Sequence, residues 1–489
     1  MHGGAASAEA TLTAYHNEFP HAAPWPLSPG AATMGSMATS PSVLTDPLSR
    51  SARKARVGIA KLVQDDAPKL MTRGYGFGAA IWDRTRAGAR AVPMRLLGRQ
   101  ALLVRGAEGV ATFYDNDRIA RHGAMPAFVQ ETLFGHGSVH SLDGTEHRHR
   151  KATFVDVAYE DAAVEALKPL LEREWRAERD EWIAGGDRSA YDAAAGALGR
   201  AIMHWAGLPG TDEALTRWSA RMAQIVDGFG APYSPSFPLA AANRAWSDRH
   251  AHKLIEAVRG GELDAPEGSA LRAWAWHRDE NDLLLPANLA GIELQNCIRP
   301  MVAVARFVAF AAKELHDRPE WRDRIAASVE ERGGAFVDDP VAVAFAQEVR
   351  RTAPFVPVLP GWATTDIEVD GEVVPKGGRV VLDILGTNTD DRSWERAGAF
   401  DPSRFLGVDD YEAIDTFIPH GGAGVATGHR CPGEKLAIAG LAAAAAALSD
   451  PRVRILDEGL EVNRRRLPTK PASGGKVRAA AAVAKCPFH

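Results

Sequence analysis

The sequence feature that most constrains the fold is a glycine-rich loop that ends in a cysteine and runs into a helix. The loop covers 420–428, Cys431 follows it, and the next stretch, GEKLAIAGLAAAAAALSD, predicts an alanine- and leucine-rich helix. Unpaired N–H groups and the dipole at a helix start favour a thiolate there. Gly433 leaves room beside the sulfur, so Cys431 suits the axial position of a heme iron. The alternative is a small buried apolar side chain.

Composition narrows the class of protein. The 489 residues are 46% hydrophobic and 24% charged, as in a soluble globular protein. The formal net charge of −5 argues against nucleic acid as the main partner. No uninterrupted apolar run is long enough to span a membrane, and no secretory signal is visible. The cysteines contain no CxxC pair, which argues against a local zinc site and suits a cytoplasmic protein; they are Cys297, Cys431 and Cys486.

The pattern along the chain predicts a mainly α protein with a small β portion. Residues 1–55 are rich in Ala, Ser, Gly and Pro and predict a disordered extension, and 56–489 predict a single large domain. Within that domain, VDGEVV predicts a β-hairpin. The other elements predicted are a strand at 99–106 and helices at 107–121, 161–185 and 287–315, of which the last is apolar on nearly every face and belongs in the core.

Glu348 and Arg351 lie three residues apart on a predicted helix, so both project from one face. The usual interpretation of such a pair is a solvated ion pair of little energetic weight. Arg404, in DPSRF, could join the pair in a buried network. A buried network is costly to disrupt, so it would suit fixing the Cys431 loop in place.

Three motifs in this order resemble the cytochrome P-450 superfamily of heme-thiolate proteins. They are ExxR at Glu348–Arg351, the DPSRF segment, and GHRCPGE around Cys431. The resemblance covers 56–489 and implies the mainly α fold of that superfamily, with heme b ligated by Cys431. The loop departs from the pattern, because Gly424 stands where a Phe is usual, so only the ligand is carried over.

The core helix at 287–315 narrows the chemistry. Most members of that superfamily carry an acid–threonine pair there, whereas here Arg299 and Pro300 hold the place. Pro300 removes an N–H and predicts a kink that costs about 3 kcal/mol. An unpaired guanidinium in an apolar helix is very expensive, so Arg299 must meet an anion. The anion is either an Asp or Glu of the fold or a substrate carboxylate, which arginine can bind through two parallel hydrogen bonds.

The Arg–Pro pair and its surroundings resemble the fatty-acid peroxygenase family of cytochromes P-450. LFGHGSVHSLDG, EHRHRK and QEVRRTAPF agree with this family. The resemblance implies hydrogen peroxide as oxidant and no redox partner. A long-chain fatty acid would dock its carboxylate on Arg299, and that carboxylate would supply the acid–base function that the helix lacks. Oxidation would then fall on Cα or Cβ.

Two residues of the LFGHGSVHSLDG loop are candidates for the substrate pocket. By resemblance, His140 aligns with a position where hydroxylating members often carry Gln and alkene-forming, decarboxylating members carry His. Phe134 would line the substrate channel. The alternatives are a loop histidine that makes a backbone hydrogen bond and a core aromatic side chain.

A basic cluster at the start of the next helix is expected to face the heme propionates. His147 and Lys151 lie four apart, on one side of that helix, and are the main candidates. Arg121 and His429 are further candidates for this role. A solvated basic face is the alternative.

The sequence leaves two rival functions open. One is a conventional monooxygenase supplied with electrons by a ferredoxin and reductase, and the other is a heme-thiolate sensor without turnover. The absence of a flavin- or nicotinamide-binding domain is consistent with peroxide use. Chain-length preference, α versus β selectivity, and hydroxylation versus decarboxylation are not determined by the sequence.

Overall fold

Helices form most of the computed structural model, which describes residues 65–230 and 232–480. The extension predicted at 1–55 and Cys486 lie outside the described residues. The longer helices are α7 (Gly144–Ala158), α8 (Asp161–Ile183), α9 (Ala190–Trp205), α10 (Asp212–Gly228), α11 (Ser236–Arg259), α13 (Ala287–Ala303), α14 (Ala305–Asp317), α15 (Pro319–Glu331), α16 (Pro340–Thr352) and α18 (Glu434–Leu448). Shorter ones are α3 (Ala67–Arg73), α4 (Phe77–Trp82), α5 (Gly106–Phe113), α6 (Ala127–Val129), α12 (Ala270–Ala275) and α17 (Ile384–Asn388).

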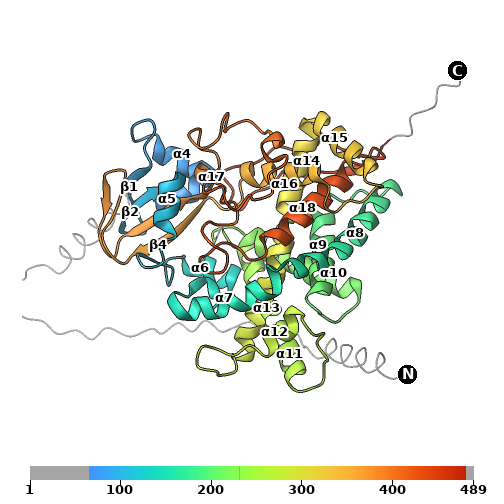
Figure 1. The fold of residues 1–489 in the computed structure, drawn as a ribbon, viewed down its shortest axis with the longest axis horizontal. Helices are drawn as coiled ribbons and strands as arrows, with labels where there is room; N and C mark the ends of the chain where they lie inside the picture. Colours follow the sequence, from blue (N-terminus) through green and yellow to red (C-terminus); the bar gives the residue numbers. More distant parts are fainter. Residues whose placement is uncertain (1–64, 231, 481–489) are drawn as a thin grey trace, which may run out of the picture. The chain divides into compact units, whose positions relative to one another are not determined.

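The β portion is small, and its main sheet lies to one side of the helices (Figure 1). Its main sheet has the order β1-β2-β7-β4-β3, in which only β2 and β7 pair in parallel. The strands are β1 (Ala91–Leu96), β2 (Arg99–Val104), β3 (Ile119–Ala120), β4 (Val358–Ala363) and β7 (Arg379–Asp383). Two further pairs are β5 (Ile367–Val369) with β6 (Glu372–Val374) and β8 (Val453–Ile455) with β9 (Val477–Ala479).

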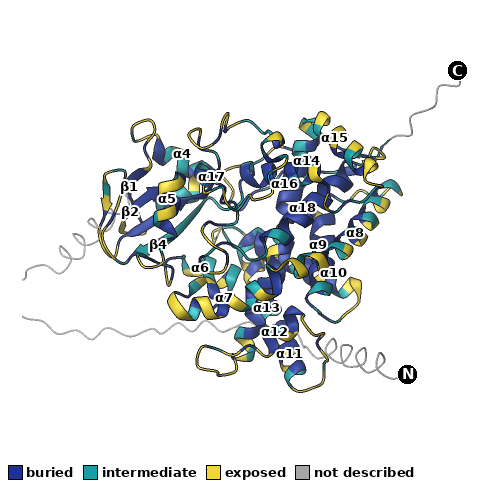
Figure 2. Cartoon of the chain, viewed as in Figure 1, coloured by how far each residue is buried: buried dark blue, intermediate teal, exposed yellow. Residues whose placement is uncertain are grey.

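The core is built around α18. Its side chains are buried from Leu436 to Leu448, and α8, α14 and α16 pack against it. Figure 2 shows α18 in dark blue along nearly its whole length. An alanine-rich helix allows this packing because its short side chains let neighbouring helices approach closely. The Cys431 loop therefore leads directly into a helix in which every residue from Leu436 to Leu448 is buried.

Most predicted elements are confirmed, with two differences. The helix predicted at 107–121 ends at Phe113, because Asp115 accepts a hydrogen bond from the Asp117 N–H in a turn, and β3 follows. The core helix predicted at 287–315 is two helices, α13 and α14, interrupted at Val304. The interruption lies one turn after Pro300, which cannot donate to the Asn296 carbonyl. The VDGEVV hairpin is β5–β6, with Asp370 and Gly371 both at positive φ.

Among the described residues, no helix is both long and apolar enough to cross a membrane.

Candidate functional site

Cys431 lies at the N-terminal end of α18, as predicted. Its N–H donates to the His420 carbonyl over 3.0 Å, which closes the loop between them. The Gly433 N–H points at the sulfur and, with the Lys151 charge, lowers the pKa of the thiol, but burial outweighs both and raises it. Cys431 is still only half-buried, and a side chain added at Gly433 would meet no atom within 4 Å. Open space therefore lies beside the sulfur, as a flat ligand requires.

A second set of residues, missed in the sequence, holds the Cys431 loop to α16. Arg350 forms a buried ion pair with Glu434, and Arg430 donates to the same carboxylate over 2.6 Å. The Arg350 guanidinium also lies 2.9 Å from Nδ1 of His420. Burial lowers the pKa of His420 to about 3, so this nitrogen is a neutral acceptor. The sequence signal that could have revealed this set is the pair of adjacent arginines, 350 and 351, in a largely apolar helix.

The predicted network of Glu348, Arg351 and Arg404 is present, but it holds a different segment. Glu348 and Arg351 are fully buried and form two hydrogen bonds of 2.7 Å, and Arg404 lies 3.7 Å from the carboxylate. Arg351 also donates to carbonyls of 388–399. The network therefore fixes 388–401, and it reaches the Cys431 loop only through the Asn388 side chain, which accepts from the Ile418 N–H over 2.8 Å.

Arg299 is 2% exposed and has no carboxylate partner among the described residues. One terminal nitrogen, Nη2, donates to the Asn296 side-chain oxygen, and the other, Nη1, is buried without a hydrogen bond. Burial lowers the pKa of Arg299 well below its usual range, and the Arg244 charge adds to this. Pro300, the next residue, is exposed, in contrast to the buried residues before it on α13. The alternative that the sequence left open, an Asp or Glu of the fold paired with Arg299, is therefore not found within the described chain.

Phe134 and His140 lie together beside Arg299. Their rings stack with centroids 4.0 Å apart and an angle of 25°. Phe134 ends a π turn (η2, Gln130–Phe134), and His140 lies in a 3-10 turn (η3, Val139–Ser141). Burial, and then the Arg299 charge, lower the pKa of His140 to about 3. The His140 side chain is nonetheless accessible, so it faces an internal space rather than the tightly packed core.

The four predicted propionate contacts also cluster. His147 on α7 stacks on His429 at 4.1 Å, and Lys151, one turn further on, donates to the Arg430 carbonyl over 2.8 Å. Arg121 donates to the Phe113 carbonyl and keeps its Nε buried without a partner. Their pKa values are lowered, chiefly by burial: about 10 for Arg121, about 8 for Lys151, about 4 for His147 and about 2 for His429.

Known proteins match both the sequence and the fold. The Cytochrome P-450 family model matches residues 338–448. Cytochrome P-450SP alpha (CYP152B1), in complex with (R)-ibuprophen, is 35% identical, with a TM-score of 0.77 over 85% of this chain and 98% of that chain. A variant of cytochrome P-450 OleT in complex with arachidonic acid is 28% identical, with a TM-score of 0.77 over 85% of this chain and 97% of that one. The chain belongs to the fatty-acid peroxygenase family of cytochromes P-450.

The curated relatives of this cytochrome P-450 match only over a short part of their length. Cytochrome P-450 76AD1 of Beta vulgaris is 34% identical over 93 residues, which is 18% of that protein. The short sequence matches therefore indicate the superfamily. The structural matches, which cover nearly all of the matched proteins, indicate the family.

Heme is the cofactor of this cytochrome P-450 family, and the residues present fit it. The Cys431 sulfur has open space beside it, and Arg299 lies near enough to His140 for its charge to lower the pKa of that ring. Arg121, His147, Lys151 and His429 form no ion pair with a carboxylate in the described chain. An anionic group of the cofactor would complement the charges of Arg121 and Lys151 and could accept N–H bonds from the two neutral histidine rings. Arg121 Nε is the one of these groups that remains a buried unpaired donor.

Proposed function

We propose that this chain oxidises long-chain fatty acids at Cα or Cβ with hydrogen peroxide, and that Arg299 holds the substrate carboxylate. One observation carries the proposal: a guanidinium 2% exposed has one nitrogen hydrogen-bonded and the other without a partner. A buried unsatisfied cation is costly, and a carboxylate is the anion that fits its fork. The fatty acid named in the OleT complex is consistent with such a ligand.

The docked carboxylate supplies a function that α13 lacks. Bound through Cys431, heme provides the iron at which peroxide is activated, with the thiolate favouring O–O cleavage. Arg299 and Pro300 replace the usual proton-relaying side chains, and neither is a base. The carboxylate that Arg299 would hold could serve as the base and then the acid toward peroxide. With its carboxyl end anchored there, the chain presents only its first carbons for oxidation.

We further propose that His140 affects which product forms. At neutral pH its ring is uncharged, because its pKa is about 3. Stacked on Phe134 beside Arg299, it borders the carboxyl end of the substrate. Both hydroxylation and decarboxylation to a terminal alkene fit this arrangement.

Turnover measurements on the heme-loaded protein test the proposal. We expect hydroxy acids or alkenes from myristate or palmitate with peroxide alone, and none without peroxide. A requirement for a ferredoxin and reductase would instead establish a conventional monooxygenase, and no product under either condition would indicate a sensor.

Substitution of Arg299 tests the docking role. Arg299→Ala should lose fatty-acid oxidation and recover part of it when a short carboxylate is added, because that carboxylate can take the vacated place. Arg299→Lys, which keeps the charge but loses the fork, should fall between the two. Unaltered oxidation by Arg299→Ala would contradict the role of this guanidinium.

A further inference from the structure

Glu293 is a fully buried carboxylate on α13, about two turns before Arg299, and neither the sequence motifs nor the proposed chemistry uses it. Its Oε1 accepts a hydrogen bond of 2.7 Å from the Val139 N–H and lies 3.5 Å from Nη1 of Arg150. Its Oε2 accepts one of 2.9 Å from the Asn296 side-chain amide. Glu293 therefore connects the helix that carries Arg299 to the loop that carries His140.

Glu293 determines which way the Asn296 amide faces. Nδ2 of Asn296 donates to Glu293 and, over 3.1 Å, to the Phe134 carbonyl. Both of these partners are acceptors, so they require the NH₂ end of the amide. Oδ1 is thereby left facing Arg299, where it accepts from Nη2. This arrangement fixes one branch of the guanidinium and leaves Nη1 as the donor available to a ligand.

The same carboxylate also holds the loop that carries Phe134 and His140. Val139, whose N–H it holds, immediately precedes His140, and the Phe134 carbonyl is held by the Asn296 that Glu293 orients. Arg150, which lies beside Glu293, donates to the Gly137 carbonyl over 2.8 Å. The Phe134–His140 loop is thus held at three points, two by Glu293 and Asn296 of α13 and one by Arg150 of α7, and Glu293 contacts both of the other two side chains.

We propose that Glu293 is the positioning residue that sets Arg299 and the Phe134–His140 loop in register for a fatty-acid carboxylate. This inference rests on the proposed function, because it assumes that Arg299 is the carboxylate site. Glu293 itself does not touch the substrate. It acts by keeping the acceptor of Asn296 toward the guanidinium, so that the free donor of Arg299 has one orientation.

Glu293→Gln in the heme-loaded protein tests the inference. Glutamine keeps the size of the side chain but brings its own N–H₂ donors, so either the Val139 N–H or the Asn296 amide must then face a donor. We expect binding of laurate to weaken about tenfold, as for the loss of an oriented hydrogen bond to a charged group. Binding of 1-dodecanol, which lacks the carboxylate, should stay as in the wild type. Both affinities can be read from the change that the ligand causes in the heme absorption spectrum.

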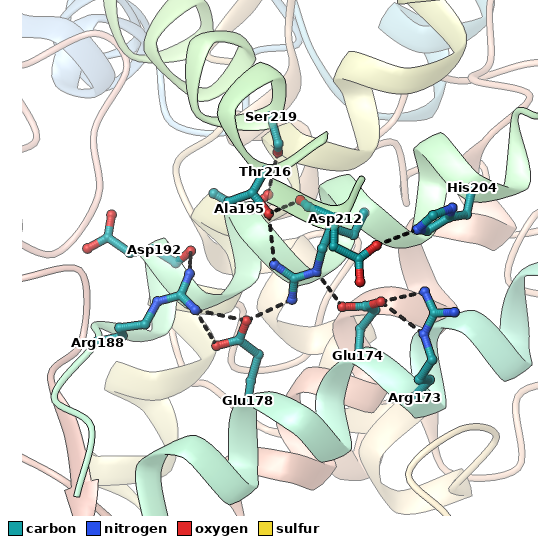
Figure 3. A network of polar contacts seen from close by, with 11 residues as sticks. Arg173, Glu174, Glu178, Arg188, Asp192, Ala195, His204, Asp212, Thr216 and Ser219 are labelled. Atoms are coloured by element: carbon teal, nitrogen blue, oxygen red, sulfur yellow. Dashed lines mark hydrogen bonds and ion pairs between the residues drawn. The ribbon is translucent and has the colours of Figure 1, made fainter. Parts of the chain in front are cut away.

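Glu174→Gln is the matched control. Glu174 is also a buried carboxylate, 3% exposed, but it lies on α8 and pairs with Arg173 of the same helix and Arg200 of α9 (Figure 3). This variant should lose thermal stability and keep the wild-type ratio of laurate to dodecanol affinity. A general loss of stability alone would not change that ratio, so the ratio separates positioning from a purely structural role.

Two further variants, at Asn296 and Arg299, ensure that every outcome either supports or contradicts the role of Glu293. If Glu293→Gln does not fold, Asn296→Leu removes the same acceptor from Arg299 while Glu293 keeps Val139 and Arg150, and it should show the same carboxylate-specific loss. Wild-type selectivity for laurate in these variants, or equal weakening of both ligands, would overturn the role of Glu293. If Arg299→Ala also binds laurate like the wild type, the proposed function fails, whatever Glu293 does.

Discussion

Burial of single histidines is expected to make the stability of this protein depend on pH. Five histidines of the described chain have a lowered pKa, and burial is the largest cause for each: His140, His147, His277, His420 and His429. Of these, His277 lies away from the Cys431 loop, next to Trp274 and Thr153. Its Nδ1 lies 2.9 Å from the Thr153 hydroxyl, and its Nε2 is buried without a partner. It is therefore the clearest residue on which to measure the effect.

We predict that His277 makes the folded state less stable as the pH falls. Its pKa is about 4 in the fold, against an ordinary 6.5, so between these values the unfolded chain binds a proton that the folded chain does not. The contribution is complete above pH 6.5 and is lost toward pH 4. It amounts to about 2 kcal/mol between pH 7 and pH 5. Urea unfolding of wild type and His277→Gln at both pH values measures it, and His136→Gln, on an exposed loop residue, should keep the wild-type slope.

The identity of residue 140 should change the products. His140→Gln replaces a neutral ring that stacks on Phe134 with an amide that cannot stack in the same way. By resemblance to the hydroxylating members, we expect the ratio of alkene to hydroxy acid to fall. Mass spectrometry of the products from palmitate and peroxide gives this ratio. An unchanged ratio would mean that the stacked ring has no part in the partition.

At the scale of elements, α16 carries two neighbouring arginines with different tasks. Arg351 and Glu348 fix 388–401, whereas Arg350 and Glu434 fix the Cys431 loop. Glu348→Gln should destabilise the fold by about 3 kcal/mol or more, because it leaves the Arg351 charge buried without its carboxylate. The melting temperature and the heme retained on purification measure the loss. Glu330→Gln, exposed on α15, should leave both unchanged.

The joint between α13 and α14 is the second element with a predictable response. Pro300→Ala adds an N–H that can donate to the Asn296 carbonyl and so removes an interruption of the helix. We expect a higher melting temperature together with a smaller preference for laurate over 1-dodecanol, since Arg299 is next in the chain. A melting temperature at or below that of the wild type would show that the joint is fixed by its surroundings and not by the proline.

At the scale of the whole molecule, α8, α9 and α10 are joined by charges rather than by apolar contacts alone. Arg200 on α9 donates to Glu174 over 2.6 Å and to Glu178 over 3.0 Å, both on α8, and to the Thr216 hydroxyl on α10 over 3.2 Å (Figure 3). Arg200→Met should cost about 1–3 kcal/mol, because Glu174 and Glu178 each lose one arginine and keep only Arg173 and Arg188, respectively. Laurate affinity should not change, and thermal unfolding with a binding titration checks both expectations.

The sequence predicted those parts of the site in which the signal is local. Cys431 follows a glycine loop and precedes a helix, and Arg299–Pro300 interrupts an apolar run, so each is visible within about ten residues. Glu293 and Glu434 were passed over because the contacts that give them their roles are made with Val139, 154 positions away, and with Arg350, 84 positions away. The segment fixed by Glu348 was predicted incorrectly because Arg351 contacts backbone carbonyls there, and every residue has a backbone carbonyl, so the sequence does not mark them.

The run of alanines in α18 has a consequence for the iron ligand. Each of these side chains ends in one methyl group, and α8, α14 and α16 close in on the helix from several directions. Because α18 is packed so closely, it cannot shift or tilt unless the neighbouring helices move apart. Cys431 lies at the N-terminal end of α18, so the packing of the helices around α18 fixes the position of its sulfur. A single methylene added to a buried side chain of α18 would therefore displace the Cys431 sulfur that is to bind the heme iron.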